Sequence, residues 1–113
     1  MPTFSFAMPI LPGKTDAWLK AIAEMKGPRK SAYKASRKAA GIKREHVSRQ
    51  WTPNGDVAVV HMDAKDPASV LPAFRAPKSD FDRWFLDTVI VGVHGLKPSD
   101  PTPPTIEVVL DII

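Results

Sequence analysis

Residues 44–63, REHVSRQWTPNGDVAVVHMD, carry the clearest β-hairpin pattern in this chain of 113 residues. Two runs typical of extended strands flank the segment 53–56, PNGD. Asn-Gly between two such runs is a strong short-range signal for a tight hairpin turn. The rest of the chain is therefore best interpreted by how it extends and covers this hairpin.

A turn centred on Asn54-Gly55 fixes which side chains of the hairpin share a face, because successive side chains of a strand point to opposite sides. In this register Ser48 lies opposite His61, and Trp51 lies opposite Ala58. The predicted helix-covered face carries Val47, Arg49, Trp51, Ala58, Val60 and Met62. The other face is more polar and carries His46, Ser48, Gln50, Thr52, Val57, Val59, His61 and Asp63.

Similar patterns predict the remaining elements. Alternation of apolar and small or polar residues predicts strands over 3–10 and 106–113. A helix is predicted from Thr15 or Asp16, a second over 28–40 and a third from Ser79 to about Gly95, with a short or irregular helix after Pro67. Gly27-Pro28 separates the first two helices because proline disrupts a helix interior. Four prolines between 97 and 104 predict an extended linker.

The predicted order of elements is β-α-β-β-α-β within a single domain, residues 1–113. This order is typical of the α+β, ferredoxin-like fold, in which two helices cover one face of a four-stranded antiparallel sheet. The predicted division of the hairpin into an apolar and a polar face agrees with such a one-sided sheet.

Composition excludes several classes of function. The chain has no cysteine, which rules out disulfides and thiolate chemistry, and it has no apolar run long enough to span a membrane. We therefore expect a cytoplasmic protein. No phosphate-binding loop, dinucleotide fingerprint or haem-ligand pattern is present, so the sequence predicts no cofactor.

Charge is distributed unevenly along the chain. Nine basic residues and one acid give residues 26–49 a net charge of +8, and seven basic and eleven acidic residues give the remainder −4. A basic segment of this kind is typical either of a solvated helix face or of a surface that meets an anionic partner. Nucleic acid is one such partner, although the segment lacks a glycine-rich clamp or a helix-turn-helix pattern.

Three segments carry a resemblance to a known superfamily: LPGKTDAWLKAI (11–22), GIKREHVSRQWTPNGDVAVVHMDAKDP (41–67) and SDFDRWFLDTVIVGVHG (79–95). They resemble the dimeric α+β barrel superfamily, and within it a group of small bacterial domains without an assigned activity. Relatives in that superfamily include cofactor-free monooxygenases of antibiotic biosynthesis, muconolactone-isomerase-like proteins, EthD-type proteins and haem-using dye peroxidases. The resemblance implies a homodimer in which two sheets face each other, with the polar hairpin face inside.

Several side chains are candidates for chemistry. His61 and His94 are candidate acid/base catalysts, because imidazole titrates near neutral pH. The candidate ligand-binding residues are Trp51, Trp84, Arg49 and Tyr33. His46, His61 and Asp63 are of the residue types that bind a divalent metal, but polar residues of a dimer interface have the same pattern, and no metal is predicted. A hydrolytic set of Ser48, His61 and Asp63 lacks an oxyanion donor pair.

We expect from these residues a homodimer that binds a small aromatic or anionic molecule, as a cofactor-free monooxygenase or isomerase. Two alternatives are open at this point. The first is a structural or regulatory dimer without catalysis, in which the histidines are ordinary structural residues. The second is an electrostatic nucleic-acid binder that uses the basic segment 26–49.

Overall fold

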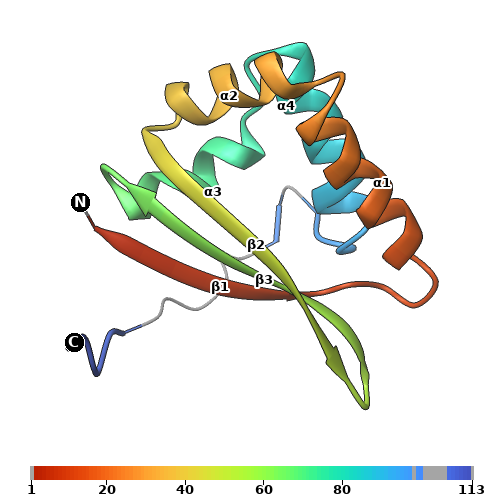
Figure 1. The fold of residues 1–113 in the computed structure, drawn as a ribbon. Helices are drawn as coiled ribbons and strands as arrows, with labels where there is room; N and C mark the ends of the chain where they lie inside the picture. Colours follow the sequence, from red (N-terminus) through yellow and green to blue (C-terminus); the bar gives the residue numbers. More distant parts are fainter. Residues whose placement is uncertain (1, 98, 101–106, 113) are drawn as a thin grey trace.

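The computed structural model describes residues 2–97, 99–100 and 107–112. They form an α+β fold in which helices cover one face of an antiparallel sheet (Figure 1). The elements are β1 (Thr3–Pro9), α1 (Thr15–Lys26), α2 (Lys30–Ala39), β2 (Ile42–Thr52), β3 (Gly55–Ala64), α3 (Pro67–Arg75), α4 (Asp80–Phe85) and the π-helix η1 (Leu86–Val91).

The sheet in the described part of the chain has three strands in the order β1-β3-β2. β3 is central and pairs antiparallel with both neighbours. Residues 107–112 were predicted to belong to a fourth strand, but they carry no regular secondary structure here. Residues 106 and 113 of that predicted strand, and positions 98 and 101–104 of the predicted linker, lie outside the described residues.

The hairpin exists, but its predicted register is wrong by two residues. Thr52 pairs with Gly55, so the turn residues are Pro53 and Asn54 rather than Asn54 and Gly55. Asn54 does not take a positive φ, whereas Gly55 has φ +120°. The fixed φ of proline suits the first central position of a turn, which explains why Pro53 begins it.

The error changes which residues lie opposite each other in the hairpin, but it does not change the face of the sheet to which each side chain points. Ser48 lies opposite Val59 and not opposite His61, and His46 is the residue opposite His61. Because the shift is even, each side chain still points to its predicted side of the sheet. The covered face therefore carries Phe6, Val60 and Val47 across the three strands, and the open face carries Ser5, His61 and His46.

Local signals account for most helix boundaries. α1 ends at Lys26, immediately before Gly27-Pro28, as predicted. The Ser79 hydroxyl accepts a hydrogen bond from the Asp82 amide and begins α4, also as predicted. Thr15 does not cap α1; its hydroxyl donates instead to Asp56 at 2.7 Å, which ties the start of α1 to the hairpin.

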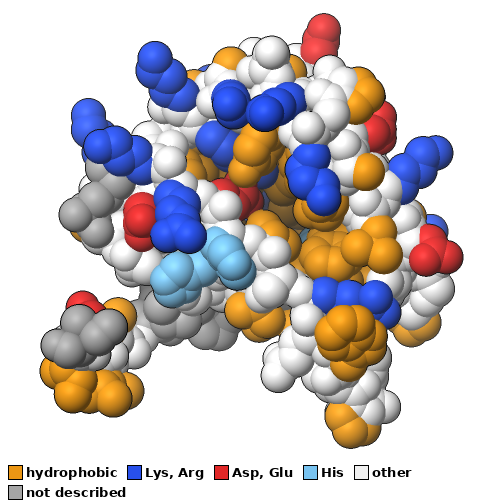
Figure 2. Space-filling view, in the orientation of Figure 1, with side chains coloured by type: hydrophobic (Ala, Val, Ile, Leu, Met, Phe, Trp, Pro, Cys, Tyr) orange, Lys and Arg blue, Asp and Glu red, His pale blue; other side chains and the backbone are white. Residues whose placement is uncertain are grey.

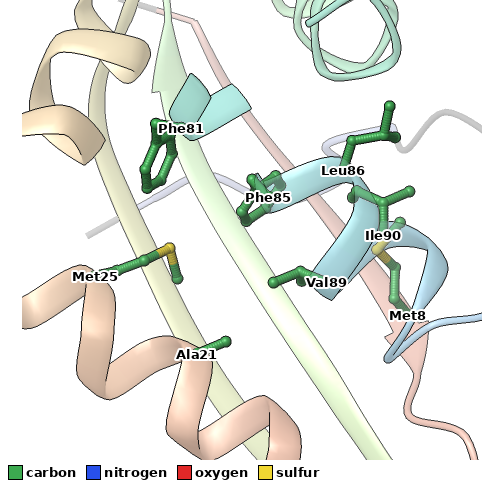
Figure 3. Packing of buried hydrophobic residues seen from close by; sticks show 8 residues of the cluster. All are labelled: Met8, Ala21, Met25, Phe81, Phe85, Leu86, Val89 and Ile90. Carbon is green, nitrogen blue, oxygen red and sulfur yellow. The ribbon is translucent and has the colours of Figure 1, made fainter. Parts of the chain in front are cut away.

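The main core lies between the helices and the covered face (Figure 3). Ala21 and Met25 of α1 face Phe85 and Val89 of α4 and η1, and Met8 of β1 packs against the same cluster. α4 continues directly into the π-helix through the β-branched run at 88–91, a run that is poor α-helix material. The wider π turn keeps Leu86, Val89 and Ile90 buried.

Candidate functional site

A cleft lies between the helices and the covered face of the sheet. Figure 2 shows it as a hollow with an apolar interior and basic side chains around its upper rim. Its cavity volume is about 40 Å³, and its mouth is open to solvent. Of its sixteen lining residues, fourteen are apolar; Trp18 and Ile22 of α1 form one wall and Ala58 and Val60 of β3 the floor. Glu45 and His94 are the two exceptions.

His94 lies just after η1 and is half-buried. Its Nδ1 is 2.9 Å from the carbonyl oxygen of Pro9. Since a carbonyl oxygen only accepts, Nδ1 carries the proton and Nε2 is left as the acceptor of the neutral ring. Burial lowers the pKa of His94 below 6.5, and the Pro9 bond offsets part of this shift. His94 is therefore a neutral base at physiological pH.

Glu45 of β2 is the other polar group of the lining, and its side chain is 8% exposed. One carboxylate oxygen, Oε1, accepts from the Tyr33 hydroxyl at 2.7 Å and from Arg37 Nε at 2.8 Å. Burial and the adjacent Glu45 carboxylate raise the pKa of Tyr33 far above its ordinary value, so the phenol keeps its proton. Oε2 takes part in neither of these two hydrogen bonds.

Arg37 balances the charge of Glu45 from behind the cleft. Its guanidinium lies 4.4 Å from the ring centre of Phe85 and 4.5 Å from that of Phe74, and both rings line the cleft. Its Nη2 is buried and has no hydrogen-bond partner among the described residues. The aromatic rings stabilise this cation in place of water. Arg37 and Glu45 therefore form a buried ion pair behind the cleft.

Sequence patterns did not single out Arg37 and Glu45. One signal existed: Glu45 is the single acid in the basic segment 26–49. A second was the spacing of Tyr33 and Arg37, four residues apart on one helix face. Six other basic residues of this segment are exposed, as both a solvated helix face and a surface for an anionic partner require: Lys26, Lys30, Lys34, Lys38, Lys43 and Arg44.

The structure separates the predicted site residues. Of the six, His94 alone lines the cleft, and Tyr33 reaches it through Glu45. Trp84 packs on Phe81 under the guanidinium of Arg29, outside the lining. Trp51, predicted to be a wall of the pocket, is 71% exposed because it lies near the end of the hairpin.

Arg49 belongs to a separate cluster at this end of the hairpin. Its guanidinium lies 4.6 Å above the Trp51 ring and pairs with Asp56 at 2.9 Å. The hydrogen bond from Thr15, aided by Arg49, keeps the pKa of Asp56 below its ordinary value despite the opposing effect of desolvation. These contacts stabilise the hairpin, and they place Arg49 and Trp51 outside the cleft lining.

His61 lies on the open face, on the other side of the sheet from the cleft. Its Nδ1 is hydrogen-bonded to the hydroxyl of Ser5 on β1, and not to Ser48 as the hydrolytic interpretation required. Asp63 accepts from Thr3 at 2.7 Å. Among the residues that the structure describes, no three histidine, aspartate or glutamate side chains converge into a metal site.

Comparisons of the chain with known family models, curated proteins and solved structures gave no match. What is shown is a small α+β domain with a three-stranded antiparallel sheet in its described part. Within that part, every helix is too short or too polar to cross a bilayer.

Proposed function

We propose that this protein is a cytoplasmic homodimer of the dimeric α+β barrel type and that its cleft binds a small hydroxylated aromatic molecule. The observation that carries the proposal is the composition of the cleft: fourteen apolar residues and two hydrogen-bond acceptors. An apolar concave site with a few polar groups is the usual form of a small-molecule site.

The two polar groups favour a ligand that donates hydrogen bonds. Neutral His94 offers Nε2, and Glu45 offers Oε2, because their other polar atoms already have partners. A ligand carboxylate would face the Glu45 carboxylate in the lining, and two like charges in an apolar site repel each other. We therefore narrow the expected ligand from aromatic or anionic to a neutral aromatic molecule with a hydroxyl group.

The chemistry we propose is removal of the hydroxyl proton by His94. The proton moves from the ligand oxygen to Nε2, the O–H electron pair remains on oxygen, and an aromatic oxyanion results. This step needs no cofactor, and it begins both isomerisation and oxygenation by dioxygen. Its two possible continuations are return of the proton at a ring carbon and attack of the electron-rich ring on dioxygen.

The dimer would form through the open face of the sheet. Among the described residues no helix covers this face, which mixes Val57 and Val59 with His46, His61 and Ser48. A mixed face of this kind can pair with a second copy across a partly polar interior. Light scattering measures the mass directly, and a monomer at micromolar concentration contradicts the dimer without affecting the cleft.

Binding is tested by calorimetry with 2-naphthol, 2-naphthoate and naphthalene. We expect 2-naphthol to bind more tightly than the other two ligands. His94→Gln should weaken 2-naphthol about 5- to 10-fold, the effect of one lost hydrogen bond of about 1 kcal/mol. Preference for 2-naphthoate, or equal binding by wild type and His94→Gln, would contradict the proposed ligand class.

A matched pair of substitutions locates the site. Val47→Trp fills the cleft, whereas Val91→Trp adds the same bulk to an exposed valine of η1 outside the lining. We expect Val47→Trp to abolish 2-naphthol binding and Val91→Trp to leave it unchanged.

A further inference from the structure

The outer edge of β1 is a largely unprotected sheet edge. β1 pairs with β3 on one side and has no strand partner on the other among the described residues. Its sequence, TFSFAMP, contains no charged residue. Natural edge strands are usually protected by charges, by proline or by a covering segment, and in the described part of the chain β1 has such protection at its Pro9 end alone. The opposite edge strand, β2, carries Lys43, Arg44 and Arg49 and fits that rule.

Two aromatic side chains make the edge of β1 apolar as well as unpaired. Phe4 and Phe6 stack with ring centres 5.7 Å apart, and both are only partly buried. They lie on the covered face, where the helices bury the equivalent side chains of β3, such as Met62. A further strand beside β1 would cover these rings.

Residues 107–112, the tail segment, have the properties that this edge needs. Val108, Leu110 and Ile112 alternate with Glu107 and Asp111, a pattern typical of a strand with one apolar face. These apolar side chains are 61%, 74% and 81% exposed. Figure 1 shows the tail segment standing away from the sheet of its own chain. Exposed apolar groups at this density are typical of an interaction site.

We propose that the tail segment of one chain pairs with the outer edge of β1 in a second copy and completes a four-stranded sheet there. In an extended conformation Val108 and Leu110 cover Phe4 and Phe6, and Glu107 and Asp111 point to the polar open face. A second copy is the occupant we favour because the tail lies free of its own β1 edge. Exchange of a terminal strand between identical chains is a common route to a dimer. The cleft plays no part in this proposal.

The absence of native cysteine allows a clean cross-linking test. Chains with Ala7→Cys, an exposed position on β1, are mixed under a mild oxidant with differently tagged chains that carry Cys at 107, 109 or 111. We expect a disulfide-linked heterodimer with at least one tail position. No heterodimer should form with Lys20→Cys, an exposed control on α1. Failure at all three tail positions overturns the proposal.

The same cysteines placed in one chain distinguish exchange from pairing within a chain. Ala7→Cys with Val109→Cys in a single chain should give linked dimers, whereas a purely internal disulfide would overturn strand exchange. The double substitution Val108→Lys with Leu110→Lys should abolish the linked heterodimer. Leu19→Lys, at an exposed leucine of α1, should leave it unchanged. A dimer by light scattering without any cross-link refutes the exchange alone, whereas a monomer refutes the proposed dimer as well.

Discussion

The two faces of the sheet place similar side chains in different surroundings. On the covered side, Glu45 and His94 line an apolar cleft, and Arg37 is buried behind it. On the open side, His61 and Asp63 bond to the hydroxyls of β1 and contact solvent. Charges interact more strongly where water is excluded. Burial, rather than residue type, therefore distinguishes the two sets of groups, and the proposed chemistry is placed on the buried set.

The largest expected effect comes from breaking the buried ion pair. Glu45→Ala leaves Arg37 without a counter-charge, and we expect a loss of about 3–5 kcal/mol in the free energy of unfolding. Asp63→Ala on the open face should cost less than about 1 kcal/mol. Urea denaturation followed by circular dichroism measures both. Equal losses in the two variants would show that the faces do not differ as described.

Removing an apolar side chain should also cost more unfolding free energy on the covered face than on the open face. Met62 on the covered face is 1% exposed, and Met62→Ala should cost about 2–5 kcal/mol because a cavity remains. Val59, three residues earlier on the open face, is half-buried in the single chain. In the monomer, at protein concentrations too low for the proposed dimer, Val59→Ala should cost about 1 kcal/mol or less. A loss that grows with protein concentration in the same denaturation series is expected if the proposed dimer covers the open face, and a loss as large as that of Met62→Ala in the monomer would contradict the difference between the faces.

A smaller effect concerns pH. The folded-state pKa of His94 is depressed, so the unfolded chain binds more protons once the pH approaches 6.5. The stability contributed by neutral His94 is present above that value and is lost as the pH falls toward the folded-state pKa. Between pH 7.5 and 5.5, the free energy of unfolding of His94→Gln should therefore fall less steeply with decreasing pH than that of the wild type. An identical slope in wild type and variant would contradict the burial of His94.

Local sequence patterns predicted much of the fold for physical reasons. Alternation identified β1 and the hairpin, Gly27-Pro28 separated α1 from α2, and Ser79 began α4. The pattern did not reveal the turn residues, because Pro53 and Asn54-Gly55 both favour a turn. The division into faces was still correct, since two-residue shifts leave each side chain on its side of the sheet.

The site was less predictable because it depends on contacts between distant segments. Trp51 continues the apolar alternation of β2, but the alternation cannot show where the helical cover ends. Arg37 looks like its basic neighbours in sequence, and only its packing against Phe74 and Phe85 buries it. His94 was selected as a titratable residue, and the Pro9 carbonyl that fixes its tautomer lies 85 positions away in the chain.

The most direct test of the central claim, that the covered face holds the ligand, is a two-dimensional ¹H–¹⁵N NMR titration with 2-naphthol. The account predicts that the largest shifts fall on amides of Ala58, Val60, Val89 and His94, and that they disappear in Val47→Trp. Shifts centred on Ser48, Val59 and His61, or no shifts at saturating 2-naphthol, would contradict it.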